Sequence, residues 1–328
     1  MSLARSLEYS WYNNNALTLL LRPLSWLYCG AVFLRRTSYA LGLRRRHRLN
    51  IPVIVVGNLT VGGTGKTPLV VHIAHLLQRS GYAPGIISRG YGGKASSWPQ
   101  QVRPDADPVM VGDEAILISR RCGCPMAVGP DRVETARQLQ RHSGCDIIIS
   151  DDGLQHYALR RDVEIVVIDG MRRFGNGLCL PAGPLREPVS RKDKVDFVIT
   201  NGTASRNEYT MRYRGETLVN LADDSRRREL AELSGEKVHV VAGIGNPARF
   251  FEQMRRKGLE VIEHAFADHH HFSAADLRFA DDLPVLMTEK DAVKCRRYAS
   301  DNMWYLPIEI EMHNDFDVQL LNLLEKRT

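Results

Sequence analysis

The chain has 328 residues, a length that suits two domains better than one. Its hydrophobic fraction of 44% and charged fraction of 25% are ordinary for a globular protein and argue against a disordered, collagen-like or coiled-coil chain. The net charge of +6 is concentrated at the N-terminus, since residues 1–48 hold eight arginines and one acid. The rest of the chain is close to neutral, so we expect no nucleic-acid partner.

Residues 16–34 are almost long and apolar enough to span a bilayer, but Arg22 and Pro23 interrupt them. A half-inserted or interfacial helix avoids most of the cost of burying Arg22, and the arginines that follow it could meet anionic lipid. A cleaved signal peptide is disfavoured because no small-residue cleavage site follows. The alternative is a soluble amphipathic helix packed on the domain. We expect residues 1–48 to form a basic, membrane-associated segment.

An α/β pattern begins at residue 51. Short apolar runs alternate with helix-like stretches, as in a parallel sheet covered on both faces. Residues 209–221 alternate around Gly215, as a hairpin or linker would, and the α/β pattern then resumes. We predict a parallel-sheet domain over 49–200 and a smaller α/β domain over 201–328. The strands expected in the first domain are 51–56, 108–111, 125–128, 146–150, 163–169 and 195–200.

A glycine-rich loop follows the first of these strands and precedes a predicted helix. The loop matches the Walker A pattern except that Thr60 replaces the first glycine. Its glycines let backbone N–H groups surround phosphate oxygens, and the helix N-terminus adds partial positive charge. We therefore predict a P-loop NTPase-type fold that binds a nucleotide, with Lys66 on the β- and γ-phosphates and Thr67 on Mg²⁺. The nucleotide-binding residues are Thr60, Val61, Gly62, Gly63, Thr64, Gly65, Lys66 and Thr67.

Acidic residues follow two of the predicted strands. Asp151 and Asp152 come directly after an apolar strand, at the position where P-loop proteins hold Mg²⁺. Asp113 and Glu114 follow another predicted strand, but acids at a helix N-terminus are an equally ordinary explanation. Histidines 269–271 cannot all face one metal on a regular element, which disfavours a zinc site. A solvated loop and a single histidine for acid–base chemistry both stay open there.

Several long sequence stretches are specific enough to compare with known families. In chain order they read VGNLTVGGTGKTP (56–68), IISRGYGG (86–93), VGDEA (111–115), VGPDR (128–132), SDDGLQH (150–156), RRFGNG (172–177), LPAGPLREP (180–188), AGIGNPARFF (242–251), FADHHHF (266–272) and MTEKDAVKC (287–295). Together they resemble the lipid A 4'-kinase family over nearly the whole chain. That family has Ser or Thr at the position of Thr60, so the departure from Walker A becomes an agreement.

The resemblance implies an ATP-dependent kinase that phosphorylates the 4'-hydroxyl of a tetraacylated glucosamine disaccharide 1-phosphate in lipid A (lipopolysaccharide) biosynthesis. The partners would be this lipid disaccharide and a membrane surface, at the cytoplasmic face of the inner membrane. A P-loop domain and a smaller α/β domain would be joined by a two-stranded linker. The rival interpretation is a P-loop ATPase switch that regulates a membrane partner, which predicts slow hydrolysis and no lipid acceptor.

The resemblance also implies roles for individual residues. Asp113 would be the catalytic carboxylate beside Lys66, and His269 would be its partner because the family's histidine directly follows the aspartate. The residues on the Mg²⁺ side would be Thr67, Glu114, Asp151 and Asp152. Those near the phosphates or the disaccharide would be Arg132, Gln155, His156 and Asn176.

Overall fold

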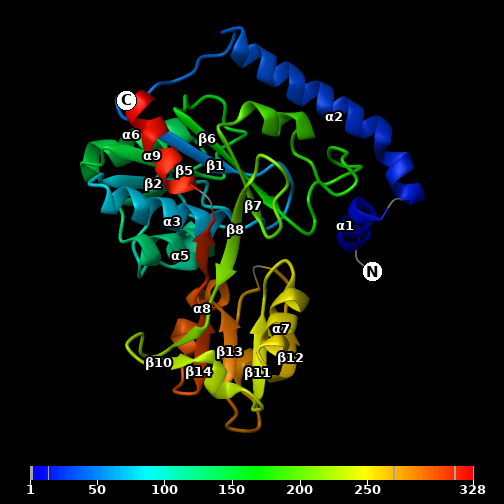
Figure 1. Cartoon of the computed structure of the whole chain (residues 1–328), viewed down its shortest axis with the longest axis vertical. Coiled ribbons are helices and arrows are strands. Elements are labelled where there is room, and N and C mark those ends of the chain that lie inside the picture. Colours follow the sequence, from blue (N-terminus) through cyan, green and yellow to red (C-terminus); the bar gives the residue numbers. More distant parts are fainter. Residues whose placement is uncertain (1–2, 14, 269, 314, 328) are drawn as a thin grey trace.

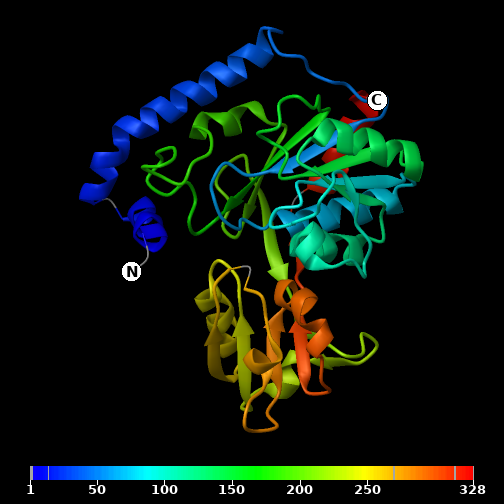
Figure 2. The ribbon, with the colours of Figure 1, turned by 180° about the vertical axis from the view of Figure 1, so that it is seen from behind.

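A computed structural model describes residues 3–13, 15–268, 270–313 and 315–327. Two sheets organise these residues, and the larger lies above the smaller in Figures 1 and 2. The larger has nine strands in the order β15-β8-β7-β6-β1-β5-β2-β4-β3. The smaller has six, in the order β10-β9-β14-β13-β11-β12. This mixed α/β architecture with parallel sheets confirms the predicted fold class.

The centre of the larger sheet is parallel and buried. The apolar, β-branched runs of its middle strands suit a sheet that is covered on both faces. Side chains alternate between two cores: Ile54 faces the core that helices α3, α5 and α9 cover, and Val55 faces the core under α6. The parallel strands are β1 (Val53–Gly57), β2 (Pro84–Ser88), β4 (Met126–Val128), β5 (Ile147–Asp151), β6 (Val163–Asp169) and β7 (Phe197–Asn201).

Helices cover both faces of this sheet, and one of them replaces a predicted strand. Residues 108–111 form helix α4 (Pro108–Val111), so the strand expected there is wrong. Asp107 accepts a hydrogen bond from the N–H of Val109 and Pro108 takes the first helical position, a combination that starts a helix. The other helices are α3 (Lys66–Arg79), α5 (Asp113–Cys122), α6 (Arg132–Ser143) and the 3₁₀ helix η1 (Val189–Lys194); the edge strand is β3 (Gln100–Gln101).

Of the two alternatives for 209–221, the hairpin is wrong, because the two halves of the segment belong to different sheets, and the segment links those sheets. β8 (Tyr209–Arg214) pairs with β7 and with β15 (Glu309–Met312). β9 (Thr217–Asn220) pairs instead inside the smaller sheet, so the chain crosses between sheets near Gly215. β15 and helix α9 (Phe316–Arg327) also belong to the larger sheet and its core. The division at residue 200 stays a prediction about folding units.

The smaller sheet carries its own core. Helix α7 packs on it through Phe250, Phe251 and Met254. Its strands are β9, β10 (Arg227–Glu229), β11 (Lys237–Ala242), β12 (Glu260–Ala265), β13 (Val285–Thr288) and β14 (Met303–Leu306). Its helices are η2 (Leu230–Leu233), α7 (Pro247–Arg256), η3 (Ala274–Leu277), α8 (Glu289–Cys295) and η4 (Arg296–Tyr298).

The N-terminal helices α1 (Leu3–Tyr12) and α2 (Ala16–Ala40) lie along the outside of the larger domain (Figures 1 and 2). Among the described residues, α2 is the one helix long and apolar enough to cross a membrane. Little of it is buried, although Ser25 donates to the carbonyl of Cys179 at 2.7 Å and Tyr28 to that of Arg186 at 3.1 Å. Its exposed apolar side chains are Leu19, Leu20, Leu24, Trp26, Leu27, Phe33 and Leu34.

Candidate active site

The P-loop and the acidic residues meet at one edge of the larger sheet. β1, β5 and β6 are parallel and end at Gly57, Asp151 and Asp169, so their carboxyl ends share this edge. Ligands of open α/β sheets bind in the crevice outside the carboxyl ends of the strands. The predicted nucleotide loop connects β1 to α3 here. The smaller domain lies against this end of the sheet (Figure 1).

The loop has a fixed shape. Gly65 adopts φ 98°, and a Cβ there would come within 2.6 Å of the Tyr213 hydroxyl, so no other residue fits. The Asn58 amide donates to the carbonyl of Gly62 at 3.2 Å. The N–H of Val61 donates to the carbonyl of Pro184 at 2.8 Å, which ties the loop to the segment after residue 180. The N-terminal end of α3 therefore opens toward the site, as phosphate binding requires.

Lys66 is the first residue of α3 and faces an acid. Its Nζ lies 3.5 Å from Oδ1 of Asp152. Both carboxylate oxygens of Asp152 also accept from Arg186, at 2.9 and 3.1 Å. Burial alone would raise the pKa of Asp152, but Lys66 and Arg186 outweigh it and lower that pKa below its ordinary value. Asp152 therefore favours its ionised form and contacts both cations.

Asp151, at the end of β5, has a different environment. It is almost fully buried, and the hydroxyl of Ser88 donates to its Oδ2 at 3.1 Å. Its Oδ1 has no hydrogen-bond partner among the described residues. Burial, with Glu114 and Asp152 nearby and against the effect of Lys66, raises the pKa of Asp151 to about 6. A buried carboxylate oxygen without a partner is a donor that Mg²⁺ accepts, together with phosphate oxygens.

Other features of the site bear on metal binding. The hydroxyl of Thr64 is likewise buried without a hydrogen-bond partner among the described residues, and Thr67 is half-buried in the first turn of α3. No group of three or more His, Cys, Asp or Glu side chains suited to a metal occurs within the described parts of the chain. Mg²⁺ usually takes only one or two carboxylates from the protein and completes its shell with phosphates and waters, so the residues present fit it.

Asp113 and Glu114 begin helix α5. Gly112 precedes them with φ 91°, and a Cβ there would come within 2.5 Å of the carbonyl oxygen of Tyr91. Asp113 is buried, and its Oδ1 accepts from the N–H of Glu114 at 3.0 Å. Both acids thus occupy the positive end of the helix dipole.

Lys290 of helix α8 links the two domains at this point. Its Nζ lies 3.1 Å from Glu114 and 3.3 Å from Asp268. Burial alone would lower the pKa of Lys290, but the carboxylates of Glu114, Asp113 and Asp268 outweigh it and raise that pKa. Our sequence analysis gave Lys290 no role, although charged residues directly after an apolar strand (284–288) were a usable signal. His269, the predicted partner of Asp113, lies outside the described residues.

Two of the predicted substrate-binding residues, Arg132 and His156, lie near each other, and Arg132 is buried beside Asp151 and Asp152. Arg132 donates to the carbonyl of Gly129 at 2.7 Å, and burial lowers its pKa to about 10 despite Asp151 and Asp152 nearby. Burial, reinforced by Arg132, lowers the pKa of His156 to about 4, so its imidazole is neutral near pH 7. Its Nε2 is buried and has no partner among the described residues.

The other two predicted substrate-binding residues brace loops. Gln155 donates to the carbonyl of Asn58 at 3.2 Å and to Glu187 at 3.0 Å, beneath the P-loop. The amide of Asn176 donates to the carbonyl of Ala182 at 2.8 Å and accepts from the N–H of Leu178 at 3.1 Å. Contact between these two residues and a substrate stays a prediction.

Comparison with known proteins agrees with this geometry. The family model for "Tetraacyldisaccharide-1-P 4'-kinase" matches residues 17–325. A protein from Nitrosococcus oceani named "Tetraacyldisaccharide 4'-kinase" is 54% identical over 96% of this chain and 93% of its own length. One of the same name from Methylobacillus flagellatus is 50% identical over 99% of this chain and 97% of its own length.

A solved structure shares the fold. It is described as an "apo" form of LpxK from Aquifex aeolicus in complex with ATP, and it matches with a TM-score of 0.81 and 27% identity. The match covers 94% of this chain and 99% of that one. The family model and the relatives each extend over nearly all of the sequence. The chain therefore belongs to the tetraacyldisaccharide-1-phosphate 4'-kinase family.

Proposed function

We propose that this enzyme transfers the γ-phosphate of ATP to the 4'-hydroxyl of a tetraacylated glucosamine disaccharide 1-phosphate, a step of lipid A biosynthesis, with Lys66 and Asp113 as its central catalytic residues. Family membership supports the reaction. The observation that carries the residue assignment is the meeting of the P-loop with two pairs of acids at one edge of the sheet.

Lys66 is the cation for the transferred phosphate. It stands at the N-terminus of α3, and Asp152 holds it in place. When the nucleotide binds, Lys66 exchanges part of its contact with Asp152 for phosphate oxygens, so little reorganisation is needed. Fixed charges of this kind stabilise a transition state because they are oriented before the reaction starts.

Asp151, Thr67 and Glu114 are the protein groups that would hold Mg²⁺. When bound, the ion would neutralise charge on the β- and γ-phosphates. Asp151 offers a buried oxygen that none of the described residues contacts by a hydrogen bond. Asp152 suits this role less well than expected from the sequence, because Arg186 and Lys66 already occupy its oxygens. We assign it to positioning Lys66.

Asp113 is placed to accept the proton of the attacking hydroxyl. Phosphoryl transfer passes through a loose transition state, so the hydroxyl loses its proton late and a carboxylate suffices as the base. Lys290 keeps the adjacent Glu114 next to Asp268 of the smaller domain. We propose that His269, which follows Asp268 in the sequence, orients Asp113 when the domains close on the substrates.

The membrane surface supplies the acceptor in this proposal. The exposed apolar side chains of α2 would lie in the interfacial region of the bilayer, with the neighbouring arginines near lipid headgroups, at the cytoplasmic face of the inner membrane. A surface helix of this kind would bring the kinase to a substrate whose acyl chains stay in the membrane.

A transfer assay tests the proposed function. Purified enzyme would be incubated with γ-labelled ATP, Mg²⁺ and the tetraacyl disaccharide 1-phosphate in detergent micelles. We expect label on the lipid, and none when the acceptor lacks a free 4'-hydroxyl. Release of free phosphate at the same rate with and without the acceptor would support the ATPase-switch alternative instead.

A further inference from the structure

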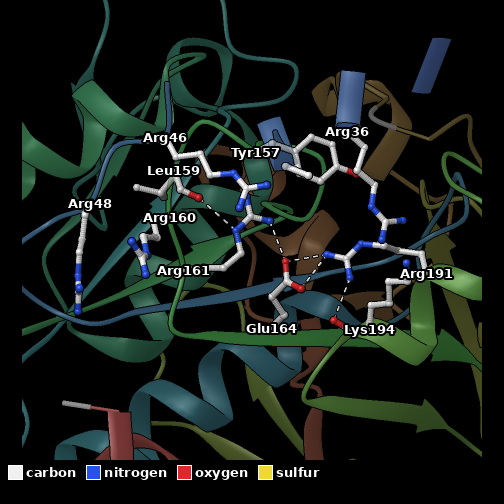
Figure 3. Close-up of a pocket in the computed structure, with 11 residues that line it drawn as sticks. Arg36, Arg46, Arg48, Tyr157, Leu159, Arg160, Arg161, Glu164, Arg191 and Lys194 are labelled. Carbon is white, nitrogen blue, oxygen red and sulfur yellow. Dashed lines mark hydrogen bonds and ion pairs between the residues drawn. The ribbon is translucent and has the colours of Figure 1, made fainter. Parts of the chain in front are cut away.

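A strongly basic pocket lies beside the C-terminal end of α2, away from the active site (Figure 3). Its volume is about 540 Å³, and seven arginine and lysine side chains line it beside one acid, Glu164. Glu164 is the second residue of β6, whereas the active-site edge lies beyond Asp169 at the other end of that strand. Five residues of strand separate the two, or roughly 17 Å, so the pocket is distinct from the nucleotide site.

The single acid of the pocket is already neutralised. Arg191 contacts both oxygens of Glu164 at 2.7 Å, and Arg161 contacts one at 2.9 Å. Other lining cations form no ion pair with any residue that the structure describes. These are Arg36, Arg46, Arg48, Arg160 and Lys194. The pocket therefore holds a large excess of positive charge, which an anionic ligand would stabilise.

The fold brings these cations together from separate segments. Residues 46–48 run beside residues 158–160: the N–H of His47 donates to Ala158 at 2.7 Å, and the N–H of Arg160 to His47 at 2.8 Å. Side chains alternate along such an extended segment, so Arg46 and Arg48 share the face opposite His47. Helix α2 adds Arg36, and the end of η1 adds Lys194. The tertiary structure thus adds cations from distant segments to the arginines that are close together in the sequence.

Apolar side chains beside the pocket indicate the kind of anion. Leu41 and Leu43, between Arg36 and Arg46 in the chain, are 70% and 77% exposed. They continue the exposed apolar surface of α2. Cations next to exposed apolar side chains suit a ligand with a charged head and an apolar tail. A guanidinium group can donate two parallel hydrogen bonds to two oxygens of one phosphate. A pocket lined by arginines therefore suits a phosphate group in particular.

We infer that this pocket binds the phosphate group of an anionic bilayer lipid, at a site separate from the catalytic one. The inference rests on the proposed membrane association for the source of the ligand. A lipid held there would fix the rotation of the enzyme on the membrane, with the pocket near the headgroups and α2 along the surface.

The test compares two double variants that remove the same charge. Arg160→Gln/Lys194→Gln alters the pocket outside the N-terminal arginine run, and both residues are exposed. Arg44→Gln/Arg45→Gln is the control, because these residues belong to the run but do not line the pocket. Full-length protein would be floated with phosphatidylcholine vesicles containing either phosphatidylglycerol or oleate at equal surface charge.

We expect wild type to bind phosphatidylglycerol vesicles more tightly than oleate vesicles. The pocket variant should lose on the order of tenfold in affinity for phosphatidylglycerol and lose the preference, while the control keeps it. Equal losses in the two variants would overturn the inference in favour of a general charge effect. Unchanged binding of the pocket variant to phosphatidylglycerol vesicles would also overturn it.

Two further measurements separate the source of the phosphate. Inorganic phosphate, at concentrations too low to screen the vesicle charge, should leave the protein bound to the vesicles. If it releases the protein, the pocket binds a soluble phosphate ligand instead. Kinase activity of the pocket variant in phospholipid-free detergent should match wild type. A raised KM of the pocket variant for the disaccharide would assign the pocket to the phosphate of the acceptor. If wild type itself transferred no phosphate, the proposed function would be wrong, and the vesicle experiment would still test the pocket.

Discussion

Lys66 is the residue on which the nucleotide chemistry depends most directly. We expect Lys66→Ala to lower kcat by about 10²–10³-fold, because Lys66 is the cation carried by the first turn of α3, whereas the neighbouring Arg186 is bound through two contacts to Asp152. Thermal unfolding should change little, since the contact with Asp152 is a single half-buried pair. The transfer assay measures the effect, with the exposed Lys326→Ala as control. Wild-type turnover in Lys66→Ala would remove Lys66 from the mechanism.

His156 gives a prediction about pH. Burial, with Arg132 nearby, lowers its pKa from 6.5 to about 4 in the folded protein. The unfolded chain therefore binds more protons between these values, so the stability that His156 contributes is present above pH 6.5 and is lost as pH falls toward 4. Replacing His156 with Gln should flatten this part of the stability profile.

Chemical denaturation from pH 7 to pH 4 would measure that profile. His142→Gln is the matched control, because His142 is exposed. A His156→Gln variant whose stability falls with acid as steeply as wild type would show that His156 is not held neutral in the folded protein.

At the residue scale, sequence reasoning located the features that form a local pattern, whereas the roles of those residues stay predictions. The P-loop directly follows β1, and Asp151 and Asp152 stand at the end of β5. Their positions at one edge of the sheet agree with expectation. Lys290 was missed because its partner Glu114 lies 176 residues away in sequence and in another domain. The contacts of Arg186 and Lys66 with Asp152 could not be predicted either, because both residues are far from Asp152 in the sequence.

At the scale of elements, α2 allows a test of membrane contact. Leu20, Leu27 and Leu34 repeat every seven residues and are 74%, 72% and 68% exposed, so they share one face of the helix. We expect Leu20→Gln/Leu27→Gln/Leu34→Gln to release most of the protein from membranes, because each buried leucine contributes about 1.5–3 kcal/mol to insertion.

Membrane fractionation measures that release. Circular dichroism checks the fold. We expect no change in the spectrum, because these exposed side chains make little contribution to the core. Val318→Gln on α9 is an exposed apolar control. Full retention of the triple variant in the membrane pellet would place the membrane contact on another surface.

Sequence patterns predict the long strands well and the short elements poorly. The long apolar strands β5, β6 and β7 were expected within two residues of their observed starts. β2 was missed because it begins with Pro84-Gly85 and has only two bulky apolar residues. The apolar run at 108–111 indicates a strand because four residues are too few to show a helical period, but the capping by Asp107 starts a helix there.

At the scale of the whole molecule, the predicted dyad requires both domains. Asp113→Ala and His269→Ala should each lower kcat by about 10²–10⁴-fold with little change in the KM for ATP, because the pair acts only on the acceptor hydroxyl. The double variant should be little worse than the worse single one. Multiplicative losses would mean independent action, and loss at His270 or His271 instead would identify a different histidine.

The contact between the domains is itself testable through Lys290. Its ammonium group joins Glu114 of the larger domain to Asp268 of the smaller one, and it is half-buried there. Removing it leaves Glu114 and Asp268 without the cation that bridges them, so their repulsion should weaken the link between the domains. We therefore expect Lys290→Met to lower kcat and to raise the KM for the lipid acceptor, while ATP affinity, which depends on the P-loop, stays the same.

Adding Glu114→Gln to Lys290→Met should restore part of the lost closure, because it removes one of the repelling charges. Small-angle scattering with both substrates bound would follow the separation of the domains, and steady-state kinetics would follow the KM. Lys257→Met is the matched control, since Lys257 forms an exposed ion pair with Glu216 inside the smaller domain at 2.8 Å. If Lys290→Met lowers kcat without any change in acceptor KM or domain separation, Lys290 acts on the chemical step and the closure argument fails.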